Sequence, residues 1–148
     1  MASESASGTV VVGVDGSEAS LEALREAQRL AEPLGAEVEA VAVWEFPQMY
    51  DGYTVMGIDG FKERAGQILQ ESVEKALGPD ATVRTRLVRG APRQALIEAS
   101  KGARMLVVGR RGHGRFGGLL IGSVSSACVA HAHCPVVVVH TPEPDRTT

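Results

Sequence analysis

Short apolar runs rich in valine alternate along this chain with longer amphipathic stretches, and that alternation leaves few possible folds. The runs expected to form strands are 9–14, 37–44, 82–88, 105–108 and 136–139. Between them, apolar residues recur at the spacing of an α-helix. Strands that alternate with helices build a parallel sheet with helices packed on both of its faces. We therefore expect an α/β fold with a five-stranded parallel doubly wound sheet and helices on both faces.

Residues at the ends of the amphipathic stretches predict where the helices begin and end. Ser17 is a candidate N-cap for the first helix, with Ser20 as an alternative, and Pro33 and Gly35 are expected to end it. The other predicted helices are 61–77, 90–99 and 123–132. No period is sustained over 45–60, which we expect to be a long loop of the kind that often carries function.

The composition fits one domain, predicted over residues 9–140, with disordered tails at 1–8 and 141–148. Hydrophobic residues make up 44% of the chain but aromatic residues only 4%, so the core must be aliphatic. No apolar run approaches the roughly 20 residues of a membrane span, and the N-terminus lacks the pattern of a secretory signal. Two cysteines are too few for a disulfide framework. We expect a cytoplasmic protein with no membrane partner.

Charge is distributed unevenly along the chain. The net charge of −3 argues against a general nucleic-acid binder. Residues 1–98 contain 16 acids and nine Lys or Arg, whereas residues 99–142 contain five Lys or Arg and no acid. Three of those five, Arg110, Arg111 and Arg115, lie in one predicted loop. A local anion site and a chance cluster of solvated arginines both account for this pattern.

The predicted topology also locates a ligand. In open parallel sheets, ligands bind at the carboxyl ends of the strands where the strand order reverses. Right-handed crossovers leave few topologies for this chain. We expect the ends of the first and fourth strands, at Asp15 and Gly109, to lie at such a point.

A glycine-rich segment follows the fourth predicted strand and leads into a helix that begins near Ser123. Glycines let the backbone approach a ligand, and successive N–H groups can form an anion-binding nest that the helix N-terminus extends. The segment is not a Walker loop, because no lysine precedes Ser123. Its Gly112–Gly117 stretch matches the dinucleotide fingerprint literally. It follows the wrong strand, however, and no acid lies within about 20 residues downstream to hold a ribose.

The informative spacing is longer: Gly109, two residues, Gly112, nine residues, then Gly122 and Ser123. In this spacing the chain resembles the ATP-binding branch of the universal stress protein family. The Val-Asp-Gly-Ser-Glu-Ala-Ser segment around Asp15 resembles the family's first strand–helix junction. The Ala-His-Cys-Pro segment followed by four valines resembles its closing strand. The resemblance covers roughly residues 9–140.

The resemblance implies a set of nucleotide contacts in this chain. The matching positions are Gly13, Val14, Asp15, Val43, Val108, Gly109, Gly112, Gly122, Ser123, Val124 and Ser125. Val43 matches a strand position whose backbone contacts adenine, and the positions from Gly112 onward match phosphate and ribose contacts. The chain departs from the family at Gly13, where proline or alanine is common, and at Arg110, where a small polar residue is common.

Several of these positions admit a second interpretation. Arg110 and His113 are either phosphate contacts or solvated side chains. Asp15 is either a cap for the first helix or a ligand for a Mg²⁺ ion carried by the nucleotide. The resemblance also implies a homodimer, with Val136–Val139 as the candidate interface strand.

The function expected from this resemblance is nucleotide-dependent regulation. We expect an ATP-binding protein of the stress response whose hydrolysis is slow or absent, since no base for water and no Walker-type lysine is recognised. Three alternatives stay open: an ATPase or phosphotransferase, a flavodoxin-like FMN carrier, and a family member that acts only through its partners. The FMN carrier would need a phosphate loop after the first strand, where Asp15-Gly16-Ser17-Glu18 offers one glycine and two acids.

Overall fold

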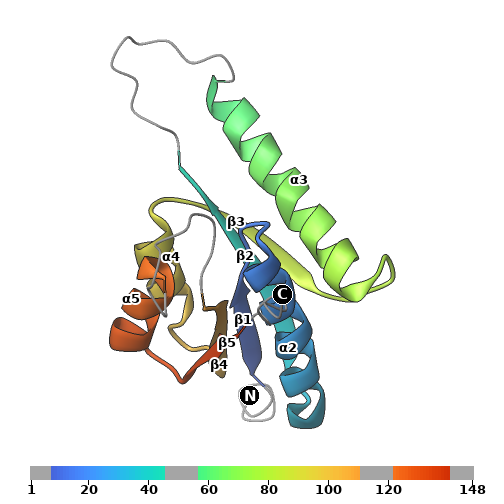
Figure 1. Ribbon diagram of the computed structural model, residues 1–148, viewed down its shortest axis with the longest axis vertical. Coiled ribbons are helices and arrows are strands. Elements are labelled where there is room, and N and C mark those ends of the chain that lie inside the picture. The colour runs from blue at the N-terminus through green and yellow to red at the C-terminus, as the bar shows by residue number, and fades with distance from the viewer. Residues whose placement is uncertain (1–7, 46–56, 111–121, 141–148) are drawn as a thin grey trace, which may run out of the picture.

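The computed structural model describes residues 8–45, 57–110 and 122–140, in which strands and helices alternate (Figure 1). The strands are β1 (Thr9–Gly13), β2 (Glu37–Trp44), β3 (Arg84–Arg89), β4 (Met105–Gly109) and β5 (Val136–Val139). The helices are α2 (Glu18–Leu34), α3 (Gly57–Leu77), α4 (Pro92–Ala99) and α5 (Ser123–His131).

All five strands pair in parallel, in the order β3-β2-β1-β4-β5. The chain therefore builds outward from β1 to β3 on one side and then crosses back to place β4 and β5 on the other. The reversal lies between β1 and β4, as the alternation in the sequence predicted. The predicted α/β fold and five-stranded parallel sheet are confirmed.

Helices cover both faces of the sheet and define two apolar clusters. One cluster joins alternate strand residues such as Val10 and Val12 to α2 and α3. The other joins Val11 and its neighbours on the opposite face to α4 and α5. Figure 1 shows the helices divided in the same way, with α2 and α3 on one side of the sheet and α4 and α5 on the other. Both clusters are aliphatic, as the low aromatic content requires.

The first helix follows its sequence signals closely. Ser17 is the N-cap of α2, and its side chain accepts a hydrogen bond from the Ser20 N–H. Gly35 follows the last helical residue in the left-handed conformation, with φ of 65°, which glycine adopts without a steric cost. Pro33 lies inside the last turn, so Gly35 rather than Pro33 marks the end of the helix.

The predicted loop over 45–60 is wrong at its end, because α3 begins at Gly57. The glycines at 57 and 60 hid this turn from pattern analysis, although Asp59 in the first turn favours a helix N-terminus. Residues 46–56 lie outside the described residues. Strand β3 runs from Arg84 to Arg89 rather than over 82–88, and it is an edge strand, as its polar alternation indicated.

Other element boundaries shift by one or two residues. β1 ends at Gly13, β4 includes Gly109, α4 begins at Pro92 and α5 ends at His131. The predicted tails lie outside the described residues, except for Gly8. Among the described helices, none combines the length and apolar character needed to cross a membrane.

Candidate functional site

The side chains of Asp15, Ser17 and Ser20 form a local hydrogen-bond network at the junction between β1 and α2. The Asp15 carboxylate accepts hydrogen bonds from the Ser17 N–H at 2.9 Å and the Ser17 hydroxyl at 2.5 Å. The Ser17 hydroxyl in turn accepts from the Ser20 N–H at 3.2 Å. The Ser20 hydroxyl donates to the Ser17 carbonyl at 3.0 Å and accepts from the Asp15 N–H at 3.3 Å. The side chain of Ser17 thus caps the N-terminus of α2, and the predicted cap role of Ser17 is confirmed.

The end of β4 lies tightly against that junction. A Cβ atom added at Gly109 would come within 2.6 Å of the Ala19 Cβ and 2.8 Å of the Ala19 backbone. Since Ala19 belongs to the first turn of α2, Gly109 sets how closely β4 and α2 approach. The Ser125 hydroxyl donates to the Gly109 carbonyl and ties the start of α5 to the same point. The strand ends predicted to meet at the switch point therefore do meet.

Arg110 and Gly122, which flank segment 111–121, lie next to each other. The Gly122 N–H donates to the Arg110 carbonyl at 2.7 Å, and the Arg110 N–H donates to the Val139 carbonyl at 2.9 Å. The predicted contacts Gly112 and His113 lie outside the described residues. Their flanking positions are nevertheless fixed, because β4, β5 and the start of α5 are joined by these backbone bonds.

Helix α5 begins without a side-chain cap. Its N-cap is Gly122, and its first turn contains no acid. The first N–H groups of a helix have no partner within it, and they carry the positive end of the helix dipole. Ser123 is exposed at this end. Such a terminus accepts an anion when the surrounding structure holds it in place.

Buried side chains hold α5 in place. Cys128 is fully buried against the sheet, and Ser125 is buried one turn earlier. Burial, with a smaller contribution from Cys134, raises the pKa of the Cys128 thiol to about 11. The thiol is therefore neutral at physiological pH and serves as packing.

Most of the predicted contacts on β1, β2 and β4 lie on the face that α4 and α5 cover. A Cβ at Gly13 would come within 2.9 Å of the Leu96 Cδ1 and 3.7 Å of the Val108 Cγ1. Val43 packs against the same cluster. Val14 does not share this face, because its side chain is buried in the α2–α3 cluster and its N–H donates to the Val41 carbonyl.

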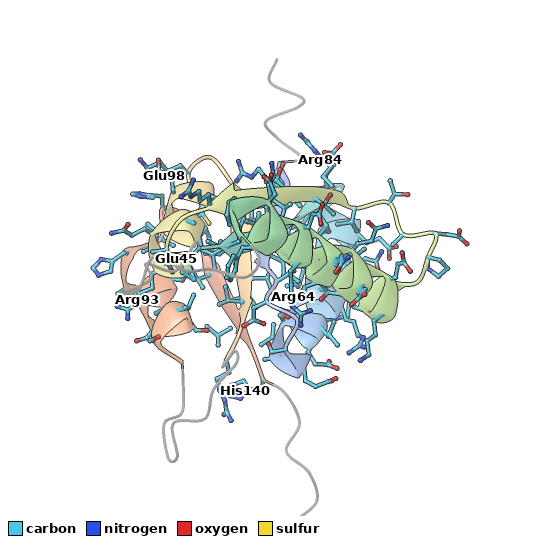
Figure 2. The ribbon with its side chains drawn as sticks, turned by 90° about the horizontal axis from the view of Figure 1, so that it is seen from above. Glu45, Arg64, Arg84, Arg93, Glu98 and His140 are labelled. Atoms are coloured by element: carbon cyan, nitrogen blue, oxygen red, sulfur yellow. The ribbon has the colours of Figure 1, made fainter. Side chains whose placement is uncertain are left out.

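A basic pair stands at the ends of β4 and β5. The Arg110 Nη1 lies 3.0 Å from the His140 Nδ1, and this contact is exposed. Figure 2 shows His140 and Arg84 on opposite sides of the molecule, as expected for residues at the two edge strands β5 and β3. His140 was not among the residues predicted from sequence. The structure brings His140 to this place because Gly109 pairs with Val139, so that the next residues, Arg110 and His140, lie side by side.

The part of the chain that contains these strands and helices matches a known protein family. The model of the Universal stress protein family matches residues 7–140. Universal stress protein Rv2623 of Mycobacterium tuberculosis is 37% identical over 95% of this chain. The chain spans about half (50%) of the length of that relative. Universal stress protein MJ0531 of Methanocaldococcus jannaschii is 29% identical over 90% of this chain and 82% of its own.

Solved structures agree with the fold. A universal stress protein crystallised in complex with cAMP superposes with a TM-score of 0.70 at 33% identity, covering 91% of this chain and 98% of its own. A family protein from Arabidopsis thaliana with AMP bound superposes with a TM-score of 0.59 at 19% identity, covering 94% and 97%. The second likeness concerns the fold alone.

Proposed function

The chain belongs to the universal stress protein family, and on that premise we propose that it is an ATP-binding regulatory protein of the stress response. The observation that carries the proposal is the start of α5, which lacks both a side-chain cap and an acid and is tied to the end of β4. The spacing of Gly109, Gly112 and Gly122-Ser123 that marks the family's ATP-binding branch falls on this point. A relative that is 33% identical was crystallised with cAMP, which supports an adenine nucleotide as ligand.

The proposed ligand extends along the carboxyl edge of the sheet. The base and ribose lie toward β2 and β1, and the phosphates lie at the start of α5. The proposed contacts are Gly13, Val14, Asp15, Val43, Val108, Gly109, Arg110, Gly112, His113, Gly122, Ser123, Val124 and Ser125. Val14 and Ser125 contribute backbone groups in this proposal, because Val14 is buried on the other face and the Ser125 hydroxyl is bonded to Gly109.

Asp15 is the proposed ligand of a Mg²⁺ ion carried by the nucleotide. Within the described residues, no group of three or more His, Cys, Asp or Glu side chains is arranged to hold a metal. Mg²⁺ commonly binds through one or two carboxylates together with phosphate oxygens and water. Asp15 is exposed at the edge where the phosphates are proposed, so its carboxylate fits that role.

Slow or absent hydrolysis distinguishes this proposal from an ATPase or phosphotransferase. Rapid phosphoryl transfer needs a positioned nucleophile and cations around the transferred phosphate, and the chain lacks the Walker lysine. A nucleotide turnover assay separates the two functions. We expect turnover far below one per second, and several turnovers per second would establish an enzyme instead.

We also propose a cytoplasmic homodimer that pairs through β5. This strand is an edge strand of four partly buried valines, Val136–Val139. An apolar edge strand with open backbone groups favours pairing with another strand. Sedimentation equilibrium should give twice the chain mass. A wild-type protein that is monomeric at all concentrations would contradict the proposed dimer. The proposal of nucleotide binding would still stand.

Calorimetric titration with ATP tests the proposed function, together with mass spectrometry of any nucleotide that co-purifies. We expect saturable heat, and no heat at millimolar ATP would reject the proposal in favour of a family member that acts only through partners. Gly122→Val should abolish the binding by blocking the backbone at the start of α5. Gly66→Ala is the matched control. Gly66 lies in α3, far from the proposed site, and a Cβ atom there would come within 3.4 Å of the Leu87 Cδ1, which is ordinary van der Waals contact.

A further inference from the structure

Arg110 and His140 leave the sheet on the same face as α5. Side chains alternate between faces along a strand, and Val108 and Val138 both pack in the α4–α5 cluster. Gly109 points to the other face, toward Ala19 of α2. Arg110 and His140, one residue further on, therefore return to the face on which α5 lies.

The contact between the two side chains determines which ring nitrogen of His140 accepts a hydrogen bond. A guanidinium has only donors, so the His140 Nδ1 must accept the hydrogen bond from Arg110. The other ring nitrogen, Nε2, is then the one that can donate, and it is directed away from Arg110. The pair consequently combines a permanent positive charge with an oriented N–H group. Such a combination suits a phosphate oxygen.

The pair lies beside the proposed phosphate position. The Arg110 carbonyl accepts from the Gly122 N–H, and Gly122 is the N-cap of α5. Arg110 and the first turn of α5 are thus adjacent through the backbone.

The distance across the carboxyl ends of the strands can be compared with the length of a nucleotide. Val43, Gly13, Gly109 and His140 stand at or just after the carboxyl ends of β2, β1, β4 and β5, which are consecutive in the sheet. With strands about 4.8 Å apart, β5 lies about 14 Å from β2. A base at β2 and a first phosphate at the start of α5 leave the second and third phosphates to extend toward β5.

We propose that Arg110 and His140 form a subsite for the phosphates beyond the first, so that the protein prefers nucleoside di- and triphosphates over monophosphates. This inference rests on the proposed adenine-nucleotide site. It assigns His140 as a specificity-determining residue and gives the unusual Arg110 a function beyond solvation. The ligand class is a nucleotide with a chain of at least two phosphates.

The test compares calorimetric affinities for ATP, ADP and AMP in EDTA at one salt concentration. Arg110→Ser should weaken ATP about tenfold, the effect of losing a charge-assisted hydrogen bond, and should change AMP less than twofold. His140→Ala should weaken ATP about threefold, again sparing AMP. Arg104→Ser is the matched control. Arg104 lies at the amino end of β4, away from the carboxyl ends where the nucleotide is proposed, so its substitution should change neither affinity.

The two variants distinguish the possible failures. Equal losses for ATP and AMP would show that Arg110 acts at the first phosphate or on the fold, and unchanged ATP affinity in both variants would show a solvated pair. Either result overturns the subsite while leaving the nucleotide site intact. If Arg110→Ser fails to fold, His140→Ala still decides, since His140 follows the last residue of β5. A wild-type protein that binds none of the three nucleotides overturns the proposed function as well.

Discussion

Two strand-to-helix junctions lie next to each other at the switch point of this sheet, and their chemistry is opposite. The first, from β1 to α2, places Asp15 and Glu18 at the start of a helix whose N-cap side chain is already hydrogen bonded. The second, from β4 to α5, has a glycine N-cap, no acid in its first turn and an arginine–histidine pair alongside. Both helices present the positive end of a dipole at the same edge.

This difference teaches that two helices can begin at the same edge of a sheet and still differ in how well their N-termini suit an anion. At α2 the Asp15 carboxylate and the Ser17 hydroxyl accept hydrogen bonds from the Ser17 and Ser20 N–H groups. Asp15 and Glu18 also supply negative charge there. At α5 no side chain caps the first turn, and this is where we propose that an anion binds. The same contrast disfavours an FMN carrier, whose phosphate would have to bind at the first junction between two acids.

The largest expected effect comes from the contact that joins the two junctions. Gly109→Ala places a Cβ within 2.8 Å of the backbone of Ala19, and the first turn of α2 cannot yield without breaking its cap network. We expect a loss of about 3 kcal/mol in the free energy of unfolding, at the upper end for overpacking. Urea denaturation measures it.

Gly13→Ala is the control for that prediction. Its Cβ meets the Leu96 Cδ1 at 2.9 Å, the end of a flexible side chain rather than backbone. We expect a loss of about 1 kcal/mol. If the two alanine variants lose the same stability, the close packing of β4 against α2 is not the constraint inferred here.

Sequence reasoning recovered the first junction better than the second. The spacing of apolar residues predicted the alternation of strands and helices along the chain. Ser17 was recognised as a cap because local chemistry alone determines that role. The switch point followed from the general handedness of crossovers. These features depend on residues near each other in the chain.

Features that depend on distant residues were not predictable in the same way. The Arg110–His140 contact arises from the register of β4 against β5, and the reason for glycine at 109 is Ala19 on another element. The start of α3 at Gly57 escaped because two glycines outweighed the acid at 59 in pattern analysis. The spacing motif located the second junction only through the family resemblance.

The next largest effect tests whether the second junction holds an anion. Ser123→Asp adds a carboxylate at the exposed first residue of α5. A negative charge at this position interacts favourably with the helix dipole. We expect ATP affinity to fall at least about tenfold through like-charge repulsion, while unfolding free energy rises by about 0.5 kcal/mol.

Ser126→Asp is the matched control for that charge. Ser126 is also exposed on α5, but its N–H already donates to the Gly122 carbonyl, so it stands one turn into the helix. Its aspartate should weaken ATP less than Ser123→Asp does. Equal losses from the two variants would point to general repulsion rather than to a phosphate at the start of the helix.

A smaller effect is expected at the first junction, on stability rather than on binding. Ser17→Ala removes the cap of α2 and two hydrogen bonds, one to Asp15 and one from the Ser20 N–H. The expected loss is about 1 kcal/mol in the free energy of unfolding, measured in urea. ATP affinity in EDTA should change less than twofold, and a tenfold loss would place the phosphates at the first junction after all.

The smallest effect separates the two helix dipoles by charge alone. Glu18 lies in the first turn of α2 and is exposed, so Glu18→Gln removes a carboxylate that favours the helix without disturbing the core. We expect a loss of about 0.5 kcal/mol at low salt, since an exposed charge interacts with a helix dipole only weakly. The loss should shrink in 1 M salt, where the Debye length is about 3 Å. A loss that persists in high salt would mean that Glu18 stabilises α2 through packing or a specific hydrogen bond, and the electrostatic contrast between the junctions would then rest on Asp15 alone.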